Sequence, residues 1–220
     1  MNQLFQRFIA IASFITVTSA YSQTPALGNL YPSAPPEGSS FVRVVNPFPD
    51  SLKLNMVGAD VPLTISGLGN IASNFKVVNP TRPFSISING KPLLDLPKIA
   101  PNSWVTLVLK RNGEGFGVTA IADSTQGRNA LKVDLRVYNL ASGCLATVTA
   151  NQKIKVFGDV AEGTTQRRSI NPVAVDFNAK CSKESAPLSV SQWVPGTSYS
   201  LFIVGDGDKP ILAGKADAVD

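Results

Sequence analysis

The chain has 220 residues, of which 44% are hydrophobic, and it carries a formal net charge of +5 from 20 basic and 15 acidic residues. The basic residues are spread along the chain, and Lys110-Arg111 and Arg167-Arg168 are its only basic doublets. A nucleic-acid-binding protein needs a concentrated basic face, so we expect no nucleic-acid partner. The sequence has no histidine, which removes the usual general base of nucleophilic catalysis and the commonest metal ligand.

Residues 1–20 have the pattern of a cleaved signal peptide. Arg7 supplies the positive charge, Phe8–Val17 form an uncharged apolar core, and small residues end the segment at Ala20. A membrane-spanning helix needs about 20 apolar residues, and this core is about half that long. We therefore expect an exported protein, located in the bacterial periplasm, with no membrane span in the mature chain.

Residues 21–39 are predicted to form an extended arm that is rich in proline from Leu30 onward. Proline fixes the backbone and removes a hydrogen-bond donor, so this segment cannot be a central strand. A stiff segment also loses little conformational entropy when it docks. Tyr31, Pro35 and Pro36 are therefore our candidate residues for contact with a partner protein.

The rest of the chain alternates short runs of β-branched and aromatic residues with Gly, Pro, Asn and Asp. This pattern is typical of antiparallel β-sandwiches. The sequence predicts a hairpin turn at Asn89-Gly90, because both residues tolerate a positive φ, and a polar loop after a strand near residue 57. Strands in the first half are expected near residues 41–46, 52–57, 75–78, 84–88, 104–109 and 116–121.

The second half of the chain repeats the first at an offset of 92 to 94 residues. Phe41–Asn46 is matched by Asp134–Asn139, Val78-Asn79-Pro80 by Ile170-Asn171-Pro172, and Ala100–Trp104 by Val194–Ser198. Anchors in one order at nearly one spacing indicate two copies of the same domain. We predict an all-β chain of two tandem antiparallel β-sandwich domains, at residues 40–123 and 131–216, joined by a linker at 124–130.

Cys144 and Cys181 are the only cysteines, and each is expected at a turn that follows a strand. Disulfides persist in exported proteins, so we predict a bridge between these two residues. Two isolated cysteines without histidine argue against a metal or redox site. Asp206 and Asp208 lie in a Gly-Asp-Gly-Asp turn whose neighbours supply too few oxygen ligands for calcium. We therefore predict no metal, no cofactor and no catalytic residue.

Arg43 and Arg136 occupy the same position of the repeat, between apolar residues that face the other way. Their side chains should point away from the core, which leaves two interpretations: a solvated sheet face, or a paired surface that contacts a partner. Aromatic residues near turns are further candidates, since an exposed ring can stack on a sugar or contact a protein. These residues are Phe48, Phe75, Phe116 and Phe157.

Three segments carry a resemblance to a known family. Leu30–Asn46, with its Leu-Tyr, Ala-Pro, Gly-Ser and Phe-Val-Arg-Val elements, resembles the start of mature AlgF proteins, which act in the periplasm in O-acetylation of alginate. Leu135–Asn139 and Arg168–Val173 are similar to later parts of that family. The two cysteines are not part of the family pattern. A related accessory family serves cellulose acetylation, so the resemblance leaves both polymers open.

The resemblance implies an accessory protein without catalytic activity. Such proteins work with a membrane O-acyltransferase and a periplasmic O-acetyltransferase of a polysaccharide secretion complex. We expect an adaptor that holds acetyl-transfer partners together, because tethering raises effective concentration without chemistry of its own. The alternative is a polysaccharide-binding module that makes weak contacts to sugar through exposed aromatic residues.

Overall fold

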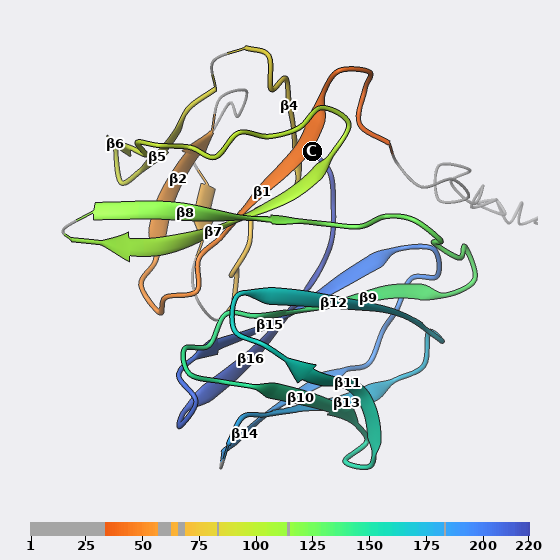
Figure 1. Ribbon diagram of the computed structural model, residues 1–220. Helices are drawn as coiled ribbons and strands as arrows, with labels where there is room; N and C mark the ends of the chain where they lie inside the picture. Colours follow the sequence, from red (N-terminus) through yellow and green to blue (C-terminus); the bar gives the residue numbers. More distant parts are fainter. Residues whose placement is uncertain (1–33, 57–62, 66–68, 83, 114, 183) are drawn as a thin grey trace, which may run out of the picture.

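The computed structural model describes residues 34–56, 63–65, 69–82, 84–113, 115–182 and 184–220. Within these residues the chain contains strands and no helix, and the strands form four sheets of four strands each. Figure 1 shows two stacked units, with β1–β8 in the upper one and β9–β16 in the lower one. The prediction of two tandem β-sandwiches is confirmed.

The first sandwich consists of the sheets β4-β1-β7-β8 and β3-β2-β5-β6. Apolar side chains such as Val42, Val44, Leu54, Ile88 and Leu107 fill the space between these sheets. The strands are β1 (Ser40–Val45), β2 (Leu52–Met56), β3 (Leu63–Ile65), β4 (Lys76–Val78), β5 (Ile86–Ile88), β6 (Lys91–Pro92), β7 (Trp104–Asn112) and β8 (Gly115–Ala122).

The second sandwich has the same topology, with the sheets β12-β9-β15-β16 and β11-β10-β13-β14. Each strand corresponds to the strand eight places earlier, so the internal repeat is confirmed. Its strands are β9 (Val133–Asn139), β10 (Ala146–Ala150), β11 (Ile154–Val160), β12 (Thr164–Ile170), β13 (Val175–Lys180), β14 (Ser185–Val190), β15 (Ser198–Gly205) and β16 (Pro210–Ala216).

The pairing of the strands also repeats. Arg43 lies opposite Thr106 in the β1–β7 pair, and Arg136 lies opposite Ser200 in the β9–β15 pair. Both of these central pairs are parallel, whereas the remaining described strand pairs are antiparallel. Alternating side chains predict a half-buried strand but not the direction of its neighbour, so the sequence alone did not reveal this mixed pairing.

A buried asparagine closes the first corner of each sandwich. Asn46 accepts a hydrogen bond from the N–H of Phe48 (3.1 Å) and donates to the carbonyl of Asp50 (2.7 Å). Asn139 likewise accepts from the N–H of Ala141 (3.2 Å) and donates to the carbonyl of Cys144 (2.7 Å). Both side chains therefore bond the local backbone, which is typical of asparagine at a turn.

Turn signals were read correctly, but one strand was missed. Asn89 and Gly90 have φ values of +51° and +80° and form the predicted turn between β5 and β6. By contrast, β3 lies where the sequence predicted a polar loop. The edge strand β12, with the sequence TTQRRSI, shows no apolar alternation of its own, and only the repeat implies it, as the counterpart of the strand expected near residues 75–78.

The predicted disulfide is confirmed. Cys144 follows β9 and Cys181 follows β13, and their sulfur atoms are bonded with the two Cα atoms 5.2 Å apart. Both residues are buried in the core of the second sandwich. Since these are the only cysteines in the sequence, the chain has no free thiol.

Replacing both cysteines (Cys144→Ala and Cys181→Ala) should lower the free energy of unfolding by about 4 kcal/mol, because the bridge closes a long loop. The measurement is urea unfolding, and reduction of the wild-type protein with dithiothreitol is the matched control. A loss below about 1 kcal/mol in both experiments would contradict the assignment of a stabilising role.

Candidate functional site

The two sandwiches contact each other through the sheets β4-β1-β7-β8 and β12-β9-β15-β16. Val45 and Val108 of the first sandwich pack with Tyr138 and Phe202 of the second in one hydrophobic cluster. The chain then returns to the first sandwich at its C-terminus (Figure 1), where the N–H of Phe75 donates to the carbonyl of Ala218 (2.8 Å). Apolar packing and backbone hydrogen bonds to the C-terminal segment therefore both contribute to the interface.

Arg43 lies fully buried at the centre of this interface. Its Nε donates to Thr106 Oγ1 (2.9 Å), and its Nη1 donates to Asp217 Oδ1 (2.7 Å). Its Nη2 donates to the Tyr138 hydroxyl and to Ser200 Oγ, both at 2.9 Å. Three of these four partners belong to the second half of the chain. We call Arg43, Thr106, Asp123, Tyr138, Ser200 and Asp217 the inter-sandwich cluster.

Aromatic rings and acidic groups together keep this buried arginine charged. Its guanidinium carbon lies 4.5 Å from the ring centroid of Phe75 and 5.3 Å from that of Phe202, which are cation–π distances. Burial alone would lower the pKa of Arg43, but attraction to Asp217, and then to Tyr138 and Asp123, raises it above the ordinary value. A charged guanidinium thus persists at any physiological pH.

Asp123 and Tyr138 complete the cluster. Asp123 accepts hydrogen bonds from Thr106 Oγ1 (2.7 Å) and from the Tyr138 hydroxyl. Burial raises the pKa of Asp123, while Arg43 and Arg136 act in the opposite direction. Burial also raises the pKa of Tyr138 to about 12. These ionisable groups are therefore engaged with each other and shielded from solvent.

The cluster follows the internal repeat. The N–H of Asp123 donates to the carbonyl of Trp104, and the N–H of Asp217 donates to the carbonyl of Ser198, each at 2.9 Å. These two aspartates therefore occupy the same repeat position, just after the last strand of each sandwich. Sequence reasoning missed them, although an aspartate at matched positions of both copies was a signal that could have revealed them.

Arg43 and Arg136 lie neither on a solvated sheet face nor on an accessible surface for a partner, the two interpretations that the sequence allowed. Their side chains point away from the core of their own sandwich, as expected, but the other sandwich covers that face, and they are 0% and 2% exposed. Arg136 donates to the carbonyl of Ser124 (2.9 Å) and to Asp134 Oδ2 (3.1 Å). A side chain buried in this way is not available to a partner protein.

The prediction of an exposed aromatic ring is also wrong for two of the four candidate residues. Phe75 and Phe157 are 1% and 4% exposed, so neither can stack on a ligand. Phe48 and Phe116 are half-buried, and the guanidinium carbon of Arg111 lies 4.8 Å and 5.9 Å from their ring centroids. Both rings therefore already have a cationic partner in Arg111. Arg111 also forms an ion pair with Asp50.

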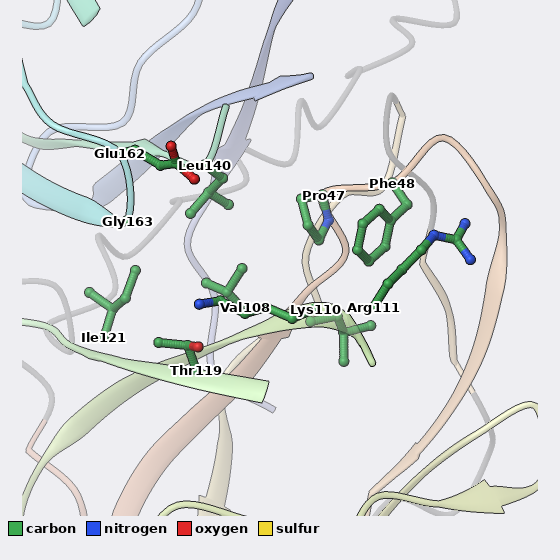
Figure 2. A pocket seen from close by; sticks show the side chains of 11 residues that line it. Pro47, Phe48, Val108, Lys110, Arg111, Thr119, Ile121, Leu140, Glu162 and Gly163 are labelled. Atoms are coloured by element: carbon green, nitrogen blue, oxygen red, sulfur yellow. The ribbon is translucent and has the colours of Figure 1, made fainter. Parts of the chain in front are cut away.

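A cleft of about 330 Å³ lies between the sandwiches on the side of this aromatic group. Figure 2 shows Leu140 and Glu162 of the second sandwich across from Phe48 and Arg111 of the first. Glu162 is the only carboxylate among the lining residues, and it accepts a hydrogen bond from the N–H of Gly143 (2.8 Å). The cleft therefore offers a mixed apolar and charged surface rather than a pair of catalytic groups.

The proline-rich arm is described only at its end. Tyr31 lies outside the described residues, Pro35 is half-buried and Pro36 is exposed. The N–H of Gly38 donates to Asn102 Oδ1 (3.2 Å), and the N–H of Asn102 donates to the carbonyl of Ser39 (2.7 Å). The arm is thus anchored to the first sandwich where it enters β1, and its contact with a partner stays a prediction.

Asp206 acts as a turn cap, as expected. Its Oδ1 accepts hydrogen bonds from the N–H groups of Asp208 (3.0 Å) and Lys209 (2.7 Å). Across the described ranges, no group of three or more Cys, Asp or Glu residues is arranged to hold a metal ion. The same part of the chain contains no helix long and apolar enough to cross a membrane.

The structure defines a class of protein in which two tandem β-sandwiches are joined by a buried ionic cluster. The chain belongs to the AlgF family, since the family described as alginate O-acetyl transferase AlgF matches residues 12–191.

Curated relatives agree with this assignment. The chain is 29% identical to the alginate biosynthesis protein AlgF of Pseudomonas aeruginosa, over 87% of this chain and 84% of that protein. It is 27% identical to the AlgF protein of Pseudomonas syringae pv. tomato, over 81% of this chain and 76% of that protein. Among solved structures, the chain is similar to CBMbc (family CBM26) from Eubacterium rectale Amy13K, with 10% sequence identity and a TM-score of 0.27. The match covers 82% of this chain and 97% of that chain, and a similarity this low says nothing about function.

The pKa of Tyr138 leads to a test of the inter-sandwich cluster. An unfolded tyrosine ionises near pH 10, whereas folded Tyr138 ionises near 12, so its contribution to stability is complete below pH 10 and is lost between pH 10 and 12. The free energy of unfolding should fall over that window by about 2 to 3 kcal/mol more in the wild type than in Tyr138→Phe.

Urea unfolding at pH 9, 10 and 11.5 measures this difference. Tyr199→Phe is the matched control, because Tyr199 is half-buried and lies outside the cluster, and it should retain most of the wild-type fall. Equal pH dependence in the wild type and Tyr138→Phe would contradict the placement of this hydroxyl.

Proposed function

We propose that the protein is a non-catalytic periplasmic accessory protein required for O-acetylation of an exopolysaccharide, namely alginate. In this proposal the signal peptide at residues 1–20 is removed, and two sandwich domains at 40–123 and 131–216 follow the arm. The mature protein bridges a periplasmic O-acetyltransferase and the membrane O-acyltransferase of the polysaccharide secretion complex. A role in alginate biosynthesis is supported by membership of the AlgF family and by the alginate biosynthesis proteins among the relatives of the chain.

The inter-sandwich cluster is the observation that carries the non-catalytic part of the proposal. Acetyl transfer through a covalent intermediate needs a nucleophile with a base beside it, both within reach of the substrate. Here Ser200, Asp123 and Tyr138 are buried and bonded to one another or to Arg43. The sequence has no histidine, and both cysteines form the disulfide. We assign the transfer chemistry in the family's description to the partner proteins.

A fixed orientation of the two sandwiches is well suited to an adaptor. Because the buried cluster holds the two sandwiches in one orientation, surfaces at opposite ends of the molecule stay at a constant separation. Partners bound at such surfaces would be held close together, which raises their effective concentration by geometry alone. This favours the adaptor over a flexible tether.

The rival function, a polysaccharide-binding module, has less support. Sugar stacking needs an open aromatic face, and Arg111 lies against the rings of Phe48 and Phe116. Lys110 and Arg111 beside the cleft are the feature that would favour it, since they could attract an anionic polymer. Retarded migration in alginate-containing gels that Arg111→Ala abolishes would support this rival.

The direct test uses the mature protein, starting at residue 21, and the purified periplasmic O-acetyltransferase of the same bacterium. Size-exclusion chromatography should show a stable complex, because bridging requires direct binding. The mature protein alone should hydrolyse p-nitrophenyl acetate no faster than buffer does. Separate elution at high protein concentration would contradict the adaptor role, and turnover by the protein alone would contradict the non-catalytic role.

The arm gives a second test. The double variant Pro35→Gly and Pro36→Gly should bind the acetyltransferase about tenfold more weakly, since a flexible arm loses more entropy on docking. Pro195→Gly is the matched control, because Pro195 is exposed but belongs to the second sandwich. Circular dichroism should show an unchanged β fold in all variants. Equal affinity of the arm variant and the wild type would remove Pro35 and Pro36 from the contact surface.

A further inference from the structure

The first sandwich has a free sheet edge at β8. This strand is the last in the order β4-β1-β7-β8, and within the described residues it pairs only with β7. The pairing runs from Val105–Ala122 to Asn112–Gly115 without a register shift. One side of this eight-residue strand therefore presents backbone N–H and C=O groups that pair with no other strand among the described residues.

Natural proteins usually protect such an edge with charges, prolines or bulges. The sequence of β8, GFGVTAIA, contains no charged residue and no proline, and its pairing is regular. Other edge strands carry these devices: β12 has Arg167 and Arg168, β11 pairs with a shifted register, and β14 contains Pro187. The lack of protection in β8 is typical of an edge that receives another strand.

A crevice of about 720 Å³ opens beside β8, between the two sheets of the first sandwich. Its apolar lining comes from both sheets and includes Ile88, Leu93, Leu94, Phe116 and Val118. Leu94, which lines this crevice, is 74% exposed and therefore accessible to a ligand. The crevice is open because the facing edge strand, β6, is only two residues long.

The second sandwich shows what closes the same place in the other copy of the repeat. There the equivalent strand, β14, has six residues and packs along β16. Leu188 is so close to β16 that a Cβ atom added at Gly214 would lie 2.8 Å from its Cδ2. In β14, Ala186, Leu188 and Val190 are the less exposed residues, and they alternate with exposed ones. An uncharged, extended segment with alternating apolar residues is therefore the chemistry that fits here.

Hydrogen bonding along β8 identifies the atoms that are free. The N–H of Asp123 donates to the carbonyl of Trp104, which places the odd-numbered residues of this strand in hydrogen-bonded pairs with β7. The backbone groups of Phe116, Val118 and Ala120 consequently point to the open edge. A strand added there would bond to alternate residues only.

We propose that β8 is the docking edge for an extended segment of a partner in the acetylation complex, which adds to the sheet as a fifth strand. The partner's alternate apolar side chains enter the crevice, while main-chain hydrogen bonds to β8 supply affinity. A second copy of this chain is a poorer occupant, because Phe116 and Val118 of its own β8 are already packed on its core. This inference rests on the adaptor function and names the surface that performs it.

Residue-resolved amide hydrogen exchange tests the proposal, with the purified periplasmic O-acetyltransferase as the probe. The amides of Phe116, Val118 and Ala120 should exchange at least about tenfold more slowly in the complex. Those of Gly117 and Thr119, already bonded to β7, should change little. Such alternation is specific to strand addition, since general coverage of the surface would slow neighbouring amides alike.

Two substitutions at one position give the matched test by binding. Val118→Pro removes one edge N–H and should weaken the complex about tenfold, whereas Val118→Thr keeps both the N–H and the β-branched shape and should bind nearly as the wild type does. Thermal unfolding confirms that each variant is folded. If Val118→Pro does not fold, Leu94→Glu replaces it, because a charge at this exposed position should repel an apolar segment.

The outcomes separate this inference from the adaptor function. A complex without alternating protection, in which Val118→Pro or Leu94→Glu binds as tightly as the wild type, overturns the strand-addition site and leaves the adaptor function standing. Absence of any complex overturns both. Alternating protection that appears without the acetyltransferase and grows with protein concentration would identify a second copy as the occupant and overturn the proposal.

Discussion

The buried charge of Arg43 is the constraint on which the arrangement of the two sandwiches depends. A guanidinium taken out of water is stable only when its donors find partners with good geometry. Here Thr106 comes from the first sandwich, while Tyr138, Ser200 and Asp217 come from the second half of the chain. The charge can therefore be satisfied only when both halves dock in one orientation, and the surrounding apolar cluster adds strength to that orientation.

This constraint connects the fold with the proposed function. Asp123, Tyr138 and Ser200 carry groups that could take part in catalysis. In this structure they are hydrogen-bonded inside the inter-sandwich cluster, where they help to hold the two sandwiches together. What remains for solvent is a set of surfaces with fixed relative positions: the arm at Pro35 and Pro36, the cleft beside Phe48, and the free edge of β8.

Much of the fold could be predicted from the sequence because it depends on patterns that are visible in the residue order. The Asn89-Gly90 turn follows from residue types at short range, the repeat from matched segments 92 to 94 residues apart, and the disulfide from the presence of only two cysteines. Burial of Arg43 could not be predicted in this way. Strand alternation shows that its side chain leaves its own core, but it does not show that a second sandwich covers it, through a bond to a residue 174 positions away. Phe75 was misjudged for the same reason, since it packs against Arg43 and Trp104 at that interface.

Differences between the two copies show how the repeat has specialised. In the first copy Phe41, Phe75 and Trp104 form an aromatic group, whereas the second copy places Asp134, which is paired with Arg167, at the position of Phe41. The second sandwich also closes its edge with β14 and carries the disulfide, while the first leaves β8 open. The second copy thus has its edge covered and carries the disulfide, whereas the first copy has the accessible edge that we propose as the docking site.

Denaturant unfolding with one tryptophan per sandwich tests whether Arg43 makes the two sandwiches a single cooperative unit. The chain has two tryptophans: Trp104 lies in the first sandwich and Trp193 packs on the core of the second, so Trp193→Phe and Trp104→Phe leave one reporter in each. In both variants the fluorescence midpoint should coincide with the midpoint from circular dichroism. Adding Arg43→Ala should separate the two transitions. Separate transitions in proteins that retain Arg43 would contradict the account.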